Sequence, residues 1–218
     1  MKKPLYYFFL FLGILITNCG LAQNPTRFES ELQKYTTDTA TFIGQDVIVF
    51  TGSSSIKMWH SLSSYFPKYI TLNRGFGGSQ MHDLFYYKDE LIVKYTPKQI
   101  FIYEGDNDIA AGKSTRKILK TTKKLVKYLR KQLPNTPIVF ISAKPSISRW
   151  HLKDDYIHFN KKLKKYCNKK KYLKFADVWS PMIAKNGEPM KDIFIKDNLH
   201  LNEKGYQIWA KVIQSFLY

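Results

Sequence analysis

Cysteine is scarce in this chain of 218 residues, which contains only Cys19 and Cys167. A small fold held together by several disulfides is therefore excluded. Cys167 lies on the apolar side of a helical pattern that also contains Phe159 and Leu163. Because a free cysteine packs like a small apolar side chain, we expect Cys167 to be a buried structural thiol and not a nucleophile.

Acidic residues are also few: 17 Asp and Glu stand against 35 Lys and Arg, and the formal net charge is +18. Such a charge is typical of proteins that bind nucleic acids or anionic surfaces. However, the lysines lie mainly on the polar side of helical patterns, as do Lys117, Lys120 and Lys124, and no recognised nucleic-acid motif accompanies them. We therefore expect no nucleic-acid partner, and a solvated basic surface that attracts acidic polymers or anionic envelope lipids.

The sequence lacks an apolar run long enough to span a membrane comfortably. The apolar run over residues 5–17 follows two N-terminal lysines and precedes the small residues Gly20 and Ala22. A basic start, a short apolar run and small residues form the order of an export signal. We therefore predict a signal peptide over residues 1–22, which is cleaved after Ala22.

Cleavage at this point leaves one mature domain over residues 23–218, which we expect in the periplasm or secreted. A competing interpretation treats residues 16–19 as a lipoprotein box with Cys19 lipidated, and a retained N-terminal anchor is a further alternative. Membrane attachment is expected only if Cys19 is lipidated.

The rest of the chain alternates apolar runs with amphipathic helical patterns. The runs typical of buried strands cover residues 45–51, 69–73, 99–103, 137–143 and 172–176. Helical periodicity predicts helices over residues 25–38, 53–65, 81–93, 114–133, 155–169 and 203–217. This alternation predicts βαβ units and a parallel sheet that is covered by helices on both faces.

Four polar or glycine-rich clusters follow predicted strands or precede the closing helix. They are residues 52–55, 75–78, 105–108 and 197–200. Because ligands bind beyond the carboxyl ends of parallel strands, we expect all four clusters to meet in one crevice. Taken alone, residues 52–55 would be an ordinary turn with a serine cap.

Together these clusters resemble the sequence blocks of the SGNH hydrolases, also called the GDSL-like lipase/acylhydrolase family. Residues 52–54 resemble the G-D-S block, residues 75–78 the oxyanion glycine loop, residues 105–108 the G-x-N-D block and residues 197–200 the D-x-x-H block. The resemblance covers nearly the whole mature chain. It implies a three-layer α/β/α sandwich with a flavodoxin-like five-stranded parallel sheet, and a serine esterase that needs no metal or organic cofactor.

The resemblance also implies a catalytic triad. Ser54 takes the nucleophile position, His200 that of the general base and then acid, and Asp197 that of the residue that orients the imidazole. Asn198 stands where the family often has glycine, and asparagine tolerates the same left-handed backbone.

The three consecutive serines leave the register of the nucleophile open. Ser53 and Ser55 are rival candidates, although the spacing to Gly52 and Trp59 favours Ser54. Ser53 replaces the usual aspartate of the family, which does not transfer protons. We therefore expect activity to survive this replacement.

The resemblance implies an oxyanion hole made by the backbone N–H groups of Ser54 and Gly78 and by the side-chain amide of Asn107. Gly77 is an alternative to Gly78 in the second block. Asp108 is expected to brace the loop. The acidic residues of this loop, Glu104 included, are expected to be solvated or structural and not metal ligands.

Several other residues each allow two interpretations. Arg149 and Trp150 end the loop after the fourth predicted strand and are candidates for a substrate-binding wall, with half-buried packing as the alternative for both. Trp179 has the same two interpretations. His82 and His151 can either line the crevice or lie on the surface.

One further pair, Asp155 and His158, has the same D-x-x-H spacing as the fourth block. It falls inside a helical pattern, with His158 off the apolar stripe, and no loop residues follow it. We therefore predict an exposed helix face there.

The sequence thus predicts an exported serine esterase that hydrolyses short acyl esters, by preference O-acetyl groups on a small molecule or carbohydrate. Short acyl groups are favoured because no additional apolar lid segment is present in the sequence. The alternative is a protein of the same fold that binds a glycan or anionic polymer without catalysis.

Overall fold

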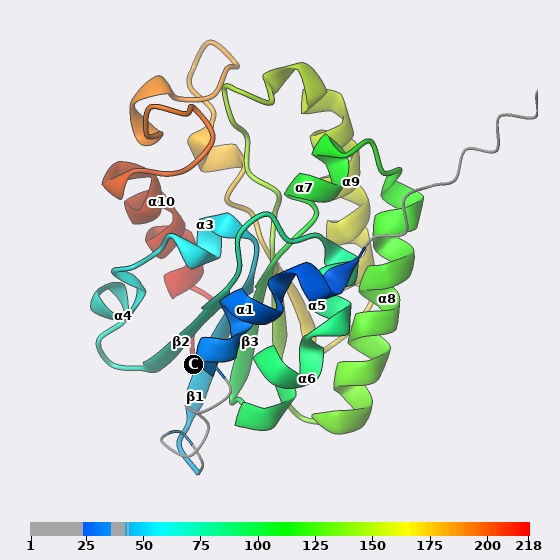
Figure 1. Ribbon diagram of the computed structural model, residues 1–218. Helices are drawn as coiled ribbons and strands as arrows, with labels where there is room; N and C mark the ends of the chain where they lie inside the picture. The colour runs from blue at the N-terminus through cyan, green and yellow to red at the C-terminus, as the bar shows by residue number, and fades with distance from the viewer. Residues whose placement is uncertain (1–23, 36–41, 43) are drawn as a thin grey trace, which may run out of the picture.

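The computed structural model describes residues 24–35, 42 and 44–218 as a central sheet between two layers of helices (Figure 1). The predicted signal peptide over residues 1–22, with Cys19, lies outside the described residues. Within the described part of the chain, no helix has both the length and the apolar character that a membrane span requires.

The sheet has five parallel strands in the order β2-β1-β3-β4-β5. Their bounds are β1 Val47–Gly52, β2 Ile70–Gly75, β3 Gln99–Tyr103, β4 Ile138–Ile141 and β5 Leu173–Ala176. This is the flavodoxin-like order, so the prediction of the fold is confirmed. In such sheets the ligand crevice opens where the strand order reverses, here between the carboxyl ends of β1 and β3.

Helices cover both faces of the sheet, and Figure 1 shows α8 and α9 on one side and α4 and α10 on the other. The first face carries α1 Glu29–Leu32, α5 Met81–Tyr86, α6 Lys88–Leu91, α8 Thr115–Gln132 and α9 Lys153–Cys167. The second face carries α3 Ser54–Lys57, α4 Leu62–Tyr65 and α10 Glu203–Gln214. A short helix, α7 Asp106–Ala110, follows β3 directly.

Six short 3-10 helices complete the described secondary structure. They are η1 Pro25–Phe28, η2 Gln33–Tyr35, η3 Val93–Tyr95, η4 Trp150–Leu152, η5 Ser180–Met182 and η6 Lys191–Ile193.

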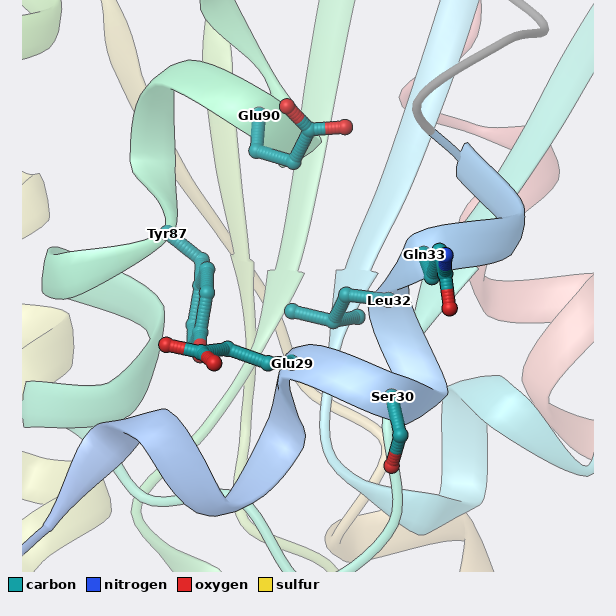
Figure 2. Close-up of a pocket in the computed structure, with 6 residues that line it drawn as sticks. All are labelled: Glu29, Ser30, Leu32, Gln33, Tyr87 and Glu90. Carbon is teal, nitrogen blue, oxygen red and sulfur yellow. The ribbon is translucent and has the colours of Figure 1, made fainter.

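A hollow with a volume of about 590 Å³ lies between α1 and the segment around α6. Its lining residues, drawn in Figure 2, are Glu29, Ser30, Leu32, Gln33, Tyr87 and Glu90. None of these belongs to the four sequence clusters described above. The hollow therefore contains none of the residues predicted for the triad or the oxyanion hole.

Three of the predicted helices are divided in the structure. The helix predicted over residues 25–38 forms η1, α1 and η2 as far as Tyr35, and its last three residues lie outside the described part of the chain. The helix predicted over residues 53–65 forms α3 and α4, because the side-chain amide of Asn73 donates to the carbonyls of Ile56 (2.6 Å) and Trp59 (3.2 Å) and ends the first helix there. The helix predicted over residues 81–93 forms α5, α6 and η3, with Ile92 at φ −131° and ψ −63° between the last two.

The longest helix, α8, agrees with its sequence pattern. Ser114 caps its first turn by accepting a hydrogen bond from the N–H of Lys117 at 3.3 Å. Its apolar stripe is buried, whereas lysines such as Lys120 and Lys124 are exposed. The prediction that these lysines lie on a solvated face is confirmed.

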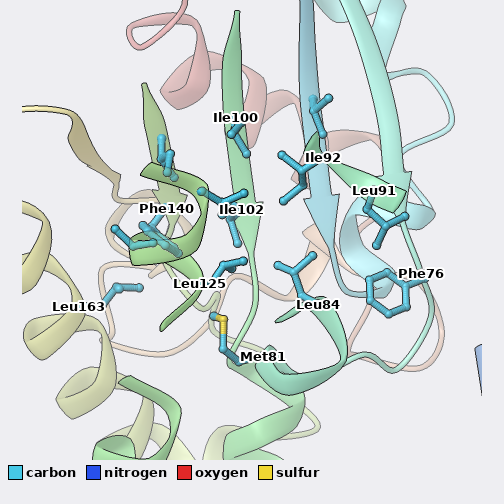
Figure 3. Packing of buried hydrophobic residues seen from close by; sticks show 14 of the residues in the cluster. Phe76, Met81, Leu84, Leu91, Ile92, Ile100, Ile102, Leu125, Phe140 and Leu163 are labelled. Carbon is cyan, nitrogen blue, oxygen red and sulfur yellow. The ribbon is translucent and has the colours of Figure 1, made fainter. Parts of the chain in front are cut away.

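The two faces of the sheet carry separate apolar cores. All six residues of β1 are buried, and successive residues alternate: Val47 and Val49 pack on the first face, Ile48 and Phe50 on the second. Figure 3 shows the first core, where Ile100 and Ile102 of the sheet pack against residues of the covering helices, such as Leu125. Burial on both faces holds the strands rigidly and so positions the loops at their carboxyl ends.

Candidate active site

The first part of the site is the turn that follows β1, beside the carboxyl end of β3. Gly52, the last residue of β1, has φ +125°, and a Cβ there would come within 1.9 Å of the carbonyl oxygen of Tyr103. Only glycine fits this close approach. The N–H of Ser53 then donates to the same carbonyl at 3.0 Å, and α3 starts at the next residue. The turn from β1 to α3 is thereby fixed against the end of β3.

The three serines of this turn have different surroundings. Ser53 and Ser55 are each only 2% exposed, whereas Ser54 is partly exposed. The Oγ of Ser54 lies 2.8 Å from Nε2 of His200. Of the three hydroxyls, the structure therefore brings that of Ser54 to the histidine.

Asp197 contacts the other side of the imidazole. Its Oδ2 lies 2.5 Å from Nδ1 of His200, and its Oδ1 accepts from the N–H groups of Leu199 and His200, both at 2.9 Å. Partial burial raises the pKa of Asp197, but the hydrogen bonds from the ring and backbone of His200 outweigh it and lower that pKa to about 2. A carboxylate at Nδ1 keeps the proton of the neutral ring on that nitrogen, which leaves Nε2 as a base facing Ser54.

The loop that carries this pair is tightly folded. Asn198 has φ +56°, so the expected left-handed backbone is present. The N–H of Ile195 donates to the carbonyl of His200 at 2.9 Å, which closes the loop. A further bond, from the N–H of Ser148 to the carbonyl of Asn198 at 3.1 Å, ties this loop to the one that follows β4.

The two candidate glycines of the loop after β2, Gly77 and Gly78, have different surroundings. The N–H of Gly77 donates to Oε1 of Glu31 at 3.1 Å and is therefore occupied. Gly78 has φ +73°, and a Cβ there would meet no other atom within 4 Å, so its surroundings are open. Within the described residues, the N–H groups of Ser54 and Gly78 have no hydrogen-bond acceptor. One backbone donor in the serine turn and one in the glycine loop are therefore unoccupied.

Asn107, in the first turn of α7, is held on both sides of its side-chain amide. Its Nδ2 donates to Oγ of Ser53 at 2.7 Å and to the carbonyl of Ser79 at 2.9 Å. Its Oδ1 accepts from Nη1 and Nη2 of Arg149 at 3.1 and 3.0 Å. The amide nitrogen thus faces the serine turn and the glycine loop, whereas the amide oxygen faces the guanidinium.

Asp106, the neighbour of Asn107, is buried in a cluster of polar side chains. Its carboxylate accepts from Nη1 of Arg149 at 2.5 Å, from the hydroxyl of Tyr103 at 2.7 Å and from the hydroxyl of Tyr156. Nζ of Lys144, a fully buried lysine, lies 3.5 Å away. Burial raises the pKa of Asp106, but the charges of Lys144 and Arg149 outweigh it and lower that pKa to about 2.

The two other acids of this loop point to different partners. Oε1 of Glu104 accepts from the hydroxyl of Ser79 at 2.5 Å, and burial, with the nearby charge of Asp108, raises the pKa of Glu104 well above its usual range. The sequence predicts that Asp108 braces its own loop; its carboxylate accepts from the N–H of Met81 at 2.8 Å and pairs with Lys113 at 3.1 Å, so it also connects this loop to the start of α5. In the part of the chain that the structure describes, no group of three or more His, Cys, Asp or Glu residues is placed to hold a metal ion.

The two residues predicted to form a substrate wall differ. The guanidinium of Arg149 is directed at Asp106 and Asn107. Trp150 is partly buried and stacks on Trp179, with ring centroids 5.9 Å apart. Packing therefore accounts for the position of both tryptophans, and a substrate contact by Arg149 or Trp150 stays a prediction.

The remaining histidines have other surroundings. Nε2 of His82 lies 2.9 Å from Asp83, and Nδ1 of His82 lies 3.2 Å from Nζ of Lys113. His151 is exposed on η4. His158 is exposed within α9 together with Asp155, which confirms the predicted helix face.

Cys167 is fully buried in α9, and burial raises the pKa of its thiol to about 12. The prediction of a structural thiol is therefore confirmed.

Sequence reasoning did not identify Lys144, Tyr103 or Tyr156. Tyr103 lies in an apolar run, and Tyr156 lies on the apolar side of a helix. Both fit these patterns as aromatic core residues, so the sequence does not indicate a polar role for their hydroxyls. Lys144 does have a signal: it closely follows the buried run of β4, where an isolated charge needs a partner.

Comparison with known proteins gives a consistent result. The model of the GDSL-like Lipase/Acylhydrolase family matches residues 41–208 of the chain. A multidomain esterase from Ruminococcus flavefaciens is 29% identical over 138 residues, which are 59% of this chain but only 17% of that protein.

Two solved structures have a similar fold. A Streptococcus pneumonia protein provisionally described as a platelet activating factor has a TM-score of 0.79 at 20% identity, covering 87% of this chain and 92% of that one. An acetylxylan esterase from Geobacillus stearothermophilus has a TM-score of 0.65 at 14% identity, covering 78% of this chain and 93% of that one. At these identities the similarity concerns the fold.

Proposed function

Since the chain belongs to the GDSL-like lipase/acylhydrolase family and is a carboxylic ester hydrolase, we propose that it cleaves short acyl esters through a Ser54–His200–Asp197 triad. The observation that carries the proposal is the 2.8 Å distance between Oγ of Ser54 and Nε2 of His200. The second support is the carboxylate of Asp197 on the opposite ring nitrogen.

The reaction proceeds in two steps. Oγ of Ser54 attacks the ester carbonyl carbon while Nε2 of His200 takes the hydroxyl proton, and His200 then gives this proton to the departing alcohol. The resulting acyl-enzyme is attacked by water, whose proton passes to His200 and then to Ser54 as the carboxylic acid leaves. Asp197 stabilises the imidazolium that exists between these transfers.

The negative oxygen of each tetrahedral intermediate is bound by three donors: the backbone N–H groups of Ser54 and Gly78, and Nδ2 of Asn107. One N–H of Asn107 is held by Oγ of Ser53 in the structure. The oxyanion therefore replaces or shares this bond when it forms. Loss of one such donor typically costs about 3–4 kcal/mol of transition-state stabilisation.

We propose O-acetyl groups as the preferred substrate class, with carbohydrates as their carriers. Two observations support this choice: the fold is similar to that of an acetylxylan esterase, and the sequence has no additional apolar segment to cover a long acyl chain. The proposed reaction requires no cofactor and no nucleic-acid partner. Hydrolysis rates over a series of acyl lengths, on acetylated sugars and on simple esters, test the preference.

We further propose that the protein is exported and acts in the periplasm or outside the cell, with membrane attachment only if Cys19 is lipidated. The support is the order of residues in the first 22 positions of the sequence. The intact mass of the mature protein tests this directly, since cleavage after Ala22 removes Cys19 and lipidation retains it.

Hydrolysis of p-nitrophenyl acetate by the purified protein tests the catalytic proposal. We expect Ser54→Ala and His200→Ala to lose nearly all activity. Two matched controls should retain it: Ser55→Ala in the same turn, and His158→Ala in the second D-x-x-H sequence. A wild-type protein no faster than the Ser54→Ala variant would reject the triad and favour the binding-only alternative.

A further inference from the structure

We propose that Arg149 is a positioning residue: anchored by Asp106, it fixes the side-chain amide of Asn107 so that an N–H of this amide faces the oxyanion. The inference rests on the proposed function, because it requires Asn107 to act as an oxyanion donor. It gives Arg149 a role in catalysis that does not require a contact with the substrate.

The contacts of Arg149 are specific. Nη1 and Nη2 both donate to Oδ1 of Asn107, at 3.1 and 3.0 Å, and Nη1 also donates to Oδ1 of Asp106 at 2.5 Å. The guanidinium also lies beside Tyr156, and the arginine side chain is only 20% exposed. These Nη donors of Arg149 are therefore directed at Asp106 and Asn107, the residues that follow β3.

The orientation of the Asn107 amide matters because the two ends of an amide group have nearly the same shape but opposite hydrogen-bonding character. A half-turn about χ2 would exchange Nδ2 and Oδ1 at little steric cost. The oxygen would then face the developing oxyanion and repel it. The site therefore needs a device that selects one of the two orientations.

The surroundings of Asn107 select the orientation from both ends. A guanidinium can only donate, so it accepts no bond from Nδ2, and the carbonyl of Ser79 can only accept, so it excludes Oδ1. The positive charge of Arg149 also draws electron density toward Oδ1, which makes the N–H groups of Asn107 stronger donors.

Asp106 holds the guanidinium in this position. Its carboxylate is buried and is itself bonded to the hydroxyls of Tyr103 and Tyr156, with Lys144 3.5 Å away. The carboxylate therefore has a fixed place and a persistent negative charge. A planar guanidinium reaches two acceptors at once, which a lysine ammonium cannot do with the same geometry.

A double-mutant cycle on Arg149 and Asn107 tests the proposal. We expect Asn107→Ala to lower kcat roughly 10²–10³-fold, the usual effect of losing one oxyanion donor. Arg149→Ala is expected to lower kcat strongly with little change in KM, because Arg149 acts on a transition-state interaction. In the Asn107→Ala background, Arg149→Ala should cause no further loss, since its target is gone.

Two further variants make the cycle decisive. Arg149→Lys keeps the charge beside Asp106 but loses the planar guanidinium, so its kcat should lie between those of wild type and Arg149→Ala. If Arg149→Ala does not fold, Arg149→Lys replaces it in the double-mutant cycle. Arg116→Ala, on the exposed face of α8, controls for the general loss of one arginine. Thermal unfolding of each variant verifies that it is folded.

The outcomes separate this proposal from the proposed function. With an active wild type, an equal fall in kcat in both backgrounds, or a change in KM alone, would overturn the positioning role and leave the esterase intact. A wild type without esterase activity would overturn both.

Discussion

Glu104 and Asp106 flank Gly105 in the loop after β3, and both are buried, yet their pKa values shift in opposite directions. Burial acts on both carboxyl groups and raises the pKa of each. For Glu104 the nearby charge of Asp108 adds to this effect, and the pKa ends well above its usual range. For Asp106 the charges of Lys144 and Arg149 reverse it, and the pKa ends at about 2.

The difference shows that, when two carboxyl groups are both buried, their charged partners decide which of them stays ionised. Asp106 has two cations and two tyrosine hydroxyls around it, and it is a carboxylate at neutral pH. Glu104 has one hydroxyl partner, Ser79, and the acids around it favour the protonated form.

The two acids also support different sides of the proposed oxyanion hole. Asp106 supports the Asn107 side of the hole through the charged guanidinium of Arg149. The side of Glu104 holds the glycine loop through a single bond to Ser79, the residue that follows Gly78. The Asn107 side depends on charged groups and the glycine-loop side does not. The variants below test each side separately.

The largest expected effect is that of Asp106→Asn. Removing this carboxylate leaves Lys144 and Arg149 without their anion in a buried site, which typically costs about 3–5 kcal/mol of unfolding free energy. Urea denaturation at neutral pH measures it, with Asp154→Asn, exposed in the first turn of α9, as the control. A loss no larger than that of the control would mean that the cluster does not depend on this charge.

The same variant makes a prediction about pH. The folded-state pKa of Asp106 is depressed, so the stability it contributes is fully present above the unfolded value of 3.8 and is lost as pH falls to about 2. The difference in unfolding free energy between wild type and Asp106→Asn should therefore narrow over this range. A difference that stays constant down to acid pH would contradict the assignment.

Ser79→Ala is expected to have an intermediate effect. It removes the hydrogen bond to Glu104 and leaves a buried carboxyl oxygen unpaired, which costs about 1–3 kcal/mol. Because Gly78 precedes Ser79, we also expect a fall in kcat that is smaller than that of Asn107→Ala. Unchanged stability together with unchanged kcat would show that this side of the hole needs no support from Glu104.

Glu104→Gln is expected to act in the opposite direction to Asp106→Asn. A carboxyl group with a raised folded-state pKa contributes stability that is fully present below its unfolded value of 4.5 and is lost as pH rises through the folded value. Glutamine stays neutral as pH rises, so the variant keeps this stability. It should therefore be more stable than wild type at about pH 7 and as stable as wild type near about pH 4. A variant less stable at neutral pH would show that Glu104 is charged in the folded protein.

The smallest expected effect on catalysis is that of Ser53→Ala. This change removes only the hydroxyl that accepts from Asn107, and the bond from Asn107 to the carbonyl of Ser79 remains. We expect most of the kcat for p-nitrophenyl acetate to be retained. Loss of activity as complete as in Ser54→Ala would make Ser53 a second candidate for the nucleophile.

The outline of the fold and the four clusters of the site could be predicted from the sequence because both depend on local patterns. Buried strands such as β1 are continuous apolar runs, and the motif residues keep fixed spacings, as Asp197 and His200 do. Parallel strands then bring these loops together at one edge of the sheet.

The polar contacts between loops could not be predicted in this way. Arg149 and Lys144 follow β4, whereas Asp106 and Asn107 follow β3, and no spacing in the sequence specifies which cation meets which carboxylate. The division of the helix after β1 has a similar origin, because it depends on the amide of Asn73 from another strand.

Covalent labelling with a fluorophosphonate tests the central claim most directly, because such reagents react with a serine hydroxyl that a neighbouring base has activated. Mass spectrometry of the intact protein and of its peptides then locates the adduct. We predict one adduct on the wild-type protein, at Ser54, with none on Ser54→Ala and much slower labelling of His200→Ala. An adduct at Ser53 or Ser55, or an unlabelled wild type, would contradict the assignment of Ser54 as the activated nucleophile.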